Sequence, residues 1–352
     1  MTRHLAAILG LGIATFAGQA PAAAAETCRV QAEPVVSLGF ASRYKADSES
    51  RSDIDPEGDA EVTAALKPVD DFIRDLSTEA NQVVLRPDSV ERADCLVAEL
   101  RRWADAGALG DLQTFTAQIS AGGRFAGISL AYLQVRNLAS RPGDIAAVDL
   151  WLQEAAREEL RFWAEDATPG AQKGNLRAWS SLGVISTGIA TGDTELVGQA
   201  ANVVEMLLCT AEPDGGLPQE MRRGKYALHY QLHAITPLVL SAALLQTRDI
   251  DLSGSCDAAL QRIVDFAVSD LETGAKSEAY SGKRQSYFDG TETLRPHELA
   301  WADYYLAMFD NADLERLVAP MRPLKNSKLG GNQDIVREHL LPGLEDPTAT
   351  EG

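Results

Sequence analysis

The sequence predicts an all-α protein, built from antiparallel helix pairs in a layered or toroidal arrangement. Three observations favour this fold class. Apolar residues recur with a helical period along most of the chain. A period-two alternation of β-branched residues never runs for long. Short turns such as Arg141-Pro142-Gly143 separate the helical stretches, and turns of that length join antiparallel neighbours.

The helical stretches can be placed one by one. Asp88 or Ser89 is expected to begin one helix as its N-cap, and Thr191 or Asp193 another. Two polar segments without an apolar face, 43–60 and 276–296, are expected to be irregular; each is either a solvated loop or a lid over a cleft. The expected helices span 60–82, 91–107, 141–166, 174–190, 193–210, 225–247, 255–272, 296–309 and 311–320.

The first 25 residues have the pattern of a secretory signal peptide. Arg3 and His4 precede an apolar run of about a dozen residues, and Ala23-Ala24-Ala25 offers a cleavage site. Residues 26–352 would then form a single domain, with an irregular tail after about 332. We expect a periplasmic protein, with secretion as the alternative. No later segment is judged apolar enough to span a bilayer, so no membrane partner is expected.

The net charge and the cysteine pattern exclude several classes of partner and of binding site. With 32 Lys and Arg against 51 Asp and Glu, the formal net charge is -19, which argues against a nucleic-acid partner and an anionic membrane surface. Four cysteines in an exported chain indicate disulfides, in any of three pairings. None of them lies in a CxxC pattern or beside a histidine, so we expect no metal and no cofactor. We expect a monomer.

The segment MRRGKYALHYQLHAITPL, residues 221–238, carries the chemistry. On a helical wheel, Arg223, Tyr226, Tyr230 and His233 share one face. The nearly opposite face carries the apolar residues Leu228, Leu232, Ile235 and Val239. A cation favours the ionised form of a nearby phenol, which can then exchange a proton. Arginine also binds carboxylates with two hydrogen bonds. Pro237 is expected to interrupt the helix.

These residue types fit β-elimination on a uronic acid. In that reaction the carboxylate is neutralised, a base removes the C5 proton, and an acid protonates the departing O4. The alternative is structural: the tyrosines pack, and the cations Arg222, Arg223 and Lys225 only cap a surface turn.

At this point the chain resembles the alginate lyases of polysaccharide lyase family 5. The family's basic pair, Ala-Leu-x-Tyr and Pro-Leu pattern is matched by Arg222-Arg223, Ala227–Tyr230 and Pro237-Leu238. RRWADAGALGD at 101–111 is similar to a second family motif. Further matches are Ser42–Lys45, Trp179, Leu299–Trp301 and Ser327–Gly331, so the resemblance runs from about 36 to 332.

The resemblance implies an incomplete α/α barrel and a lyase that cleaves a 4-linked uronic-acid polymer resembling mannuronan, alginate or glucuronan. It assigns catalysis to Tyr230, Arg223 and Asn175, while Leu176 occupies the position of the family's histidine. One tyrosine can serve as both base and acid on mannuronate, or His233 can supply the imidazole; His229 and His297 are expected to be structural or at the surface. Substrate binding is assigned to Tyr44, Arg43, Lys45, Arg177, Trp179, Arg222 and His233.

The resemblance also places a disulfide between Cys28 and Cys95, which leaves Cys209 and Cys256 as the remaining pair. The alternative function is that of a catalytically impaired relative that binds an acidic polysaccharide during export. An inverting glycoside hydrolase would need two facing carboxylates. Glu154, Glu158 and Asp303 are available, but none belongs to the Tyr230 motif. We also expect the cations of these motifs and loops to converge on one groove: Arg43, Lys45, Lys173, Arg177, Arg222, Arg223, Lys225, Lys283 and Arg284.

Overall fold

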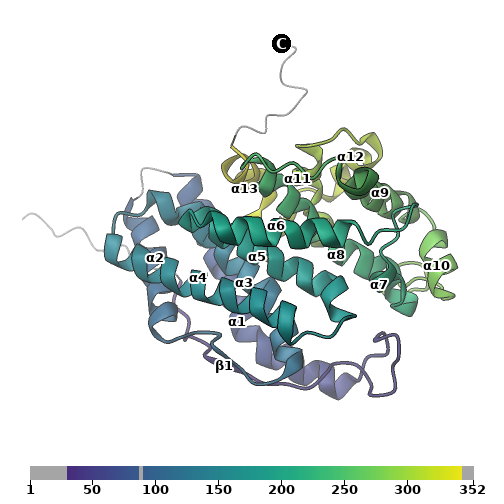
Figure 1. The fold of residues 1–352 in the computed structure, drawn as a ribbon, viewed down its shortest axis with the longest axis horizontal. Helices are drawn as coiled ribbons and strands as arrows, with labels where there is room; N and C mark the ends of the chain where they lie inside the picture. The colour runs from purple at the N-terminus through teal and green to yellow at the C-terminus, as the bar shows by residue number, and fades with distance from the viewer. Residues whose placement is uncertain (1–29, 87–89, 343–352) are drawn as a thin grey trace, which may run out of the picture.

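Helices form almost all of the regular structure (Figure 1). The structure is a computed structural model that describes residues 30–86 and 90–342. The predicted signal peptide and the N-cap at Asp88 or Ser89 lie outside the described residues. The helices are α1 Pro56–Val84, α2 Val90–Asp105, α3 Phe115–Val135, α4 Pro142–Glu165, α5 Asn175–Thr191, α6 Thr194–Leu208, α7 Pro218–Met221, α8 Ala227–Gln246, α9 Ser255–Asp270, α10 Ala275–Ser281, α11 Ala302–Leu306, α12 Ala312–Val318 and α13 Gln333–Leu340.

Two pairs of very short strands accompany the helices. β1 (Ser37–Leu38) runs parallel to β2 (Asp111–Leu112), and it ties the segment before α1 to the turn after α2. β3 (Lys325–Asn326) runs antiparallel to β4 (Gly331–Asn332) near the C-terminal end of the described chain. Neither pair forms a layer of its own, so the helices define the architecture.

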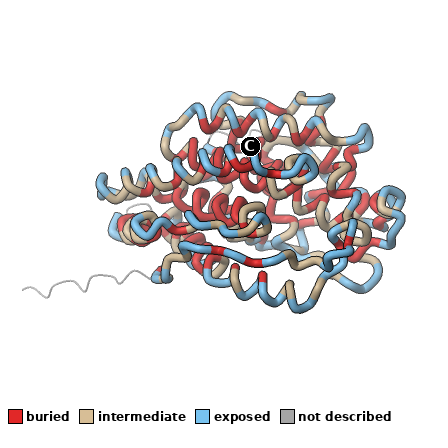
Figure 2. Tube along the Cα trace, turned by 60° about the horizontal axis from the view of Figure 1, so that its bottom comes forward, coloured by how far each residue is buried: buried red, intermediate tan, exposed pale blue. Residues whose placement is uncertain are grey.

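The helices alternate between an inner and an outer row. The inner helices α1, α3, α5 and α8 contact one another in that order, and α4 and α6 cover α5 from outside. In Figure 1, α4 and α6 cross in front of α3 and α5. α13 contacts both α1 and α11, and α11 contacts α8, so the C-terminal segment bridges the ends of the inner row. This is the predicted incomplete α/α barrel, and Figure 2 shows the buried residues concentrated along its inner helices.

The tightest contact between helices joins α3 and α5. A Cβ atom on Gly122 of α3 would lie 2.9 Å from the Cα atom of Ser180 on α5. A Cβ atom on Gly183 of α5 would lie 2.4 Å from Cδ1 of Phe125 on α3. Because real Cβ contacts are longer than this, the two backbones can approach so closely only at glycines. This contact fixes α5, whose first turn carries part of the site described below.

Three elements differ from the sequence-based expectations. Helix α3 was not expected, because its residues are buried on nearly every side and no polar stripe marks a period. Helix α8 continues through Pro237 to Gln246, since packing against its neighbours outweighs the lost hydrogen bond. Helix α13 lies in the segment that was expected to be an irregular tail. Asp193 is the N-cap of α6, as predicted, and accepts a hydrogen bond from the amide of Leu196.

One stretch is long and apolar enough to cross a membrane by length and composition, which corrects the sequence-based expectation that none is. It spans Gly224–Gln246, and 83% of its most apolar window is buried inside the protein. The core helix of a globular protein passes the same test, and that is the position α8 occupies among α5, α6, α9 and α11.

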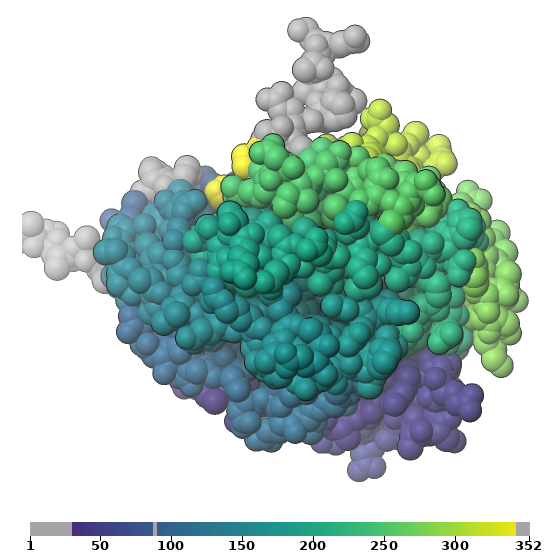
Figure 3. Space-filling model, viewed as in Figure 1, coloured from purple at the N-terminus to yellow at the C-terminus, as the bar shows by residue number. Residues whose placement is uncertain are grey.

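The two polar segments are only partly irregular. Residues 43–55 form a loop closed by a single bridge between Tyr44 and Ile54, and α1 begins directly after it. The segment 276–296 contains most of α10 before it becomes irregular. The loop before α1 lies on the surface, at the edge of the molecule nearest α7 (Figures 1 and 3).

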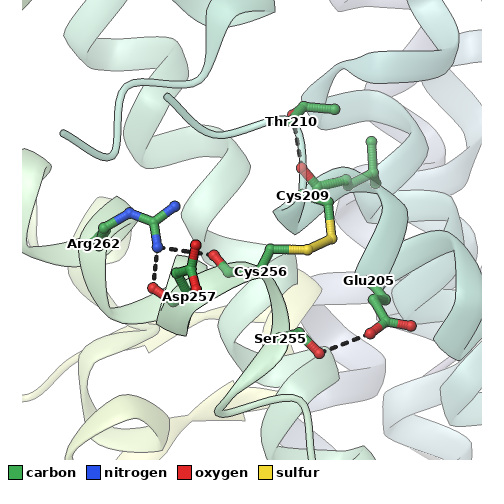
Figure 4. The surroundings of a disulfide bond; sticks show 8 residues. Glu205, Cys209, Thr210, Ser255, Cys256, Asp257 and Arg262 are labelled. Atoms are coloured by element: carbon green, nitrogen blue, oxygen red, sulfur yellow. Dashed lines mark hydrogen bonds between the residues drawn. A yellow bond between two sulfur atoms is a disulfide. The ribbon is translucent and has the colours of Figure 1, made fainter. Parts of the chain in front are cut away.

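A disulfide joins the outer helices α6 and α9 near their ends. Cys209 directly follows α6 and is bonded to Cys256 in the first turn of α9 (Figure 4). This pairing confirms the expectation for these two cysteines. The predicted Cys28–Cys95 pairing stays a prediction, because Cys28 lies outside the described residues.

Candidate active site

Two tyrosines and an arginine meet where α8 begins. The hydroxyl groups of Tyr44 and Tyr230 share a short hydrogen bond. Arg223 donates from Nη2 to the Tyr44 hydroxyl at 3.1 Å, and its guanidinium carbon lies 3.8 Å from the centre of the Tyr230 ring. The sequence placed Arg223 and Tyr230 on one helix face, and the irregular loop before α1 brings Tyr44 to them.

Opposing influences act on the Tyr230 hydroxyl. Burial raises the pKa of Tyr230 well above its ordinary value, and the nearby Arg223 guanidinium works against that rise. The hydroxyl of Tyr44 accepts a hydrogen bond from Arg223 and can turn its own proton toward Tyr230. The resting side chain is therefore a phenol that can donate a proton, in a position where a phenolate would be stabilised.

Asn175 is the first residue of α5 and is anchored by a buried glutamate. Glu220 on α7 is 1% exposed. Its carboxylate accepts hydrogen bonds from both the backbone nitrogen and Nδ2 of Asn175, each at 2.8 Å. Burial raises the pKa of Glu220 to about 7, although Arg223 and the hydrogen bonds from Asn175 oppose the rise.

The other side of the Asn175 amide faces His233. Oδ1 of Asn175 lies 3.0 Å from Nδ1 of His233, and the indole nitrogen of Trp179 lies 3.2 Å from the same Nδ1. Burial lowers the pKa of His233 to about 3, and the positive neighbours His229, Lys328 and Arg223 add to the effect. His233 is thus a neutral imidazole that bridges Asn175 and Trp179.

A cleft of about 730 Å³ lies beside these residues. His233, His229 and Trp179 line it from α8 and α5, and the Tyr230 ring centre is 5.1 Å from that of His229. The opposite wall comes from α1 and from the chain around β3 and β4. The cleft residues contributed by these segments include Asp70, Arg74, Ser77, Asn81, Lys325, Asn326, Lys328 and Asn332.

His229 and His297 both line this cleft, and their expected structural or surface role stays a prediction. Nδ1 of His229 lies 3.3 Å from Oε2 of Glu292 and 3.6 Å from Oε1 of Glu298. Burial alone would raise the pKa of Glu292, but the hydrogen bonds from His229 and Ser286 hold it below its usual value. One end of the cleft is therefore a network of carboxylates and imidazoles.

The expected basic groove is dispersed. Arg43 pairs with Asp59 at 3.4 Å, and Lys45 is exposed to solvent. Arg222 and Lys173 line a separate hollow of about 480 Å³. Arg284 pairs with Glu278 at 3.7 Å. Of the expected cations, Arg223 alone contacts the tyrosine pair among the described residues.

Arg177 and Leu176 lie beside Asn175 but do not add a proton carrier to it. Arg177 is half-buried, donates to the backbone oxygen of Gln172 at 3.1 Å, and has its pKa lowered by burial. Leu176 packs against the apolar cluster of Phe162 and Trp163.

The sequence did not single out several residues of the site. Glu220 was missed because a lone glutamate before a basic pair has no distinctive spacing. Lys328 lies in a motif that was matched, yet its role was not foreseen. It lines the cleft and lies 3.5 Å from Asp70, and burial, with repulsion from Arg124, lowers its pKa to about 8.

Comparisons with known proteins show the family to which the chain belongs. Residues 41–277 match the alginate lyase family. A polysaccharide lyase of Stenotrophomonas maltophilia is 28% identical over 290 residues, which cover 81% of this chain and 84% of the relative. An alginate lyase of Pseudomonas syringae pv. tomato is 25% identical over 334 residues, covering 93% and 85%.

Solved structures share the fold. Alginate lyase A1-III from Sphingomonas species A1 superposes with a TM-score of 0.69 at 20% identity, over 90% of this chain and 86% of that one. A variant of A1-III with a histidine replaced by alanine, complexed with a tetrasaccharide, gives a TM-score of 0.73 at 20% identity, with the same coverage. The family match spans more than half of the chain, so the protein belongs to the alginate lyase family.

Proposed function

We propose that this protein is a polysaccharide lyase that cleaves a 4-linked uronic-acid polymer, such as alginate rich in mannuronate, by β-elimination. The observation that carries the proposal is the contact among Tyr44, Tyr230 and Arg223. The Tyr230 ring neighbours His229 and His233, which line the cleft. The contact combines a group able to move a proton with a cation able to face a carboxylate. Its place in the family supports the same reaction.

The chemistry follows from these groups. Arg223 and Asn175 face the uronate carboxylate and favour the negative charge that develops there. The Tyr230 phenolate takes the proton from C5, and the freed electron pair forms the C4–C5 double bond. The bond between C4 and O4 breaks, and the same tyrosine returns its proton to O4. The products are a shortened chain and a sugar unsaturated at C4–C5.

Substrate choice follows from the use of one tyrosine for both transfers. The C5 proton and O4 must then lie on the same side of the ring, as they do in mannuronate. We propose that polymannuronate or glucuronan is cut and polyguluronate is hardly touched. We further propose that the protein acts as a monomer in the periplasm.

One experiment tests the proposal directly. Purified protein is incubated with polymannuronate, polyguluronate, glucuronan and pectate, and the ultraviolet absorbance of the new double bond is followed. The expected result is a steady rise with the first or third polymer. Leu176 favours a second candidate, a binding relative without catalysis, because its apolar surroundings hold no proton carrier. Binding of polymer without any unsaturated product would support that candidate instead.

A further inference from the structure

The buried carboxylate of Glu220 accepts two hydrogen bonds from Asn175. Oε1 accepts from the backbone nitrogen and Oε2 from Nδ2. The backbone nitrogen belongs to the first turn of α5 and has no acceptor within its own helix. Glu220 supplies that acceptor from α7, and the helix dipole favours its negative charge. One carboxylate therefore fixes the start of α5 and the side chain of its first residue together.

This contact determines which way the Asn175 amide points. An ionised carboxylate can only accept hydrogen bonds, so the amide nitrogen must be the atom that faces Glu220. The amide oxygen then faces Nδ1 of His233 at 3.0 Å. Glu220 is the one acceptor of this amide nitrogen in the described part of the chain, so its second N–H is left for a ligand.

We propose that Glu220 is the positioning residue of Asn175: as an ionised acceptor, it holds the amide with one N–H directed at the substrate carboxylate. The proposal rests on the proposed function. Glu220 has no place in the proton transfers themselves. Its contribution is that the donor is already oriented before the carboxylate charge grows in the transition state.

Protonation of Glu220 would reverse the arrangement. Its carboxyl group would then carry a donor, and the Asn175 amide would turn to offer its oxygen. Because burial raises the pKa of Glu220 to about 7, this change falls in an accessible range, and the oriented amide is lost as the pH falls through it. Arg223 and His229 are the other charged or titratable groups that act on Glu220.

The chain offers a matched control for a substitution at Glu220. Glu159 is also buried, and burial likewise raises its pKa to about 7. It accepts hydrogen bonds from Ser180 and Trp163 on a single oxygen, and it contacts neither Asn175 nor the tyrosine pair. Glu159→Gln therefore removes a buried carboxylate without touching the orientation of Asn175.

The first measurement is kinetic. Glu220→Gln keeps the shape but places an amide NH₂ against a donor of Asn175. We expect kcat to fall at least about tenfold with KM changed less than about threefold, and Glu159→Gln to stay within about twofold of the parent. Asn175→Ala combined with Glu220→Gln should be no slower than Asn175→Ala alone. Parental kcat in Glu220→Gln, or additive losses in the double variant, would overturn the proposal.

The second measurement does not depend on activity. The side-chain amide signals of Asn175 in a ¹⁵N correlation spectrum are assigned by their absence in Asn175→Ala. We expect them to shift with a midpoint near pH 7 in the parent and to lose this transition in Glu220→Gln. A transition that persists in Glu220→Gln but disappears in His229→Gln would assign the effect to His229 and refute the role of Glu220. If the parent cleaves no polymer, the proposed function fails, while this spectrum still decides on Glu220.

Discussion

At the scale of single residues, the proposed reaction depends on one hydroxyl group. Burial raises the pKa of Tyr230, so the phenolate fraction is small near neutral pH and grows as the pH rises. The rate of β-elimination should therefore increase toward alkaline pH. Arg223 limits this requirement because it favours the ionised form, whereas the hydrogen bond with Tyr44 adds to the rise in the pKa of Tyr230.

Replacing Tyr230 with phenylalanine tests this dependence. Tyr230→Phe keeps the ring beneath Arg223 and deletes the hydroxyl. Turnover should fall at least roughly a hundredfold, the usual contribution of a general acid–base group. The free energy of unfolding should drop by no more than about 1.5 kcal/mol, for one lost hydrogen bond. Initial rates followed by ultraviolet absorbance, together with a urea titration, measure both.

Two other variants make that result interpretable. Tyr226→Phe removes a hydroxyl one turn earlier on the same face, outside the contact with Tyr44, and should stay within about threefold of the parent. His233→Ala should cost far less than Tyr230→Phe, since a neutral imidazole with its pKa lowered to about 3 is a poor base. A fully active Tyr230→Phe beside an inactive His233→Ala would move the base from phenol to imidazole.

At the scale of elements, adding a side-chain atom at the glycines between α3 and α5 should destabilise the protein. Gly122→Ala would place its Cβ 2.9 Å from the backbone of Ser180, so the free energy of unfolding should fall by about 1–3 kcal/mol. Gly198→Ala on α6 is the matched control. Its Cβ meets nothing within 4 Å, and stability should rise by up to about 1 kcal/mol from helix propensity. Urea titrations in which both variants change alike would contradict the steric argument.

The Cys209–Cys256 disulfide should stabilise the outer row. It closes a loop with a sequence separation of 47 residues, and loops of that length correspond to stabilisation of about 2–4 kcal/mol through the unfolded chain. The double variant Cys209→Ser with Cys256→Ser should lose that amount in a denaturant titration. An unchanged transition midpoint would mean that the contacts between α6 and α9 hold these helices in place without the bond.

The sequence could predict features that depend on residues close together in the chain, but not those that depend on full burial or on packing between distant segments. The apolar period of amphipathic helices such as α1, α4 and α6 made them predictable from sequence. Arg223 and Tyr230 could be paired because they are close in sequence, although Arg223 lies before α8 and not within it. Helix α3 could not be found, because burial on every side erases the polar stripe. Glu220 and Asn175 are 45 residues apart, and only the packing of α7 against the start of α5 brings them together.

At the scale of the whole molecule, the charge distribution runs against the proposed substrate. The chain carries a formal net charge of -19. Two cations that line the cleft are already paired with carboxylates: Arg74 with Asp71 at 2.8 Å and Lys328 with Asp70 at 3.5 Å. A polyuronate approaching from a distance therefore meets a repulsive field, and attraction begins only close to Arg223.

This conflict predicts an unusual response to salt. At low ionic strength the repulsion acts over tens of ångströms, whereas at about 0.15 M salt it is screened beyond about 8 Å. Arg223 is partly buried, so the same salt should weaken its proposed contact with a substrate carboxylate less. We expect kcat/KM on long polymannuronate to rise severalfold between about 10 mM and 150 mM NaCl. A disaccharide or trisaccharide of the same sugar carries little charge, and its kcat/KM should change far less. If kcat/KM on the polymer falls steeply over this range instead, a continuous basic groove governs encounter, as the sequence alone had suggested, and the net charge of the molecule has no influence on binding.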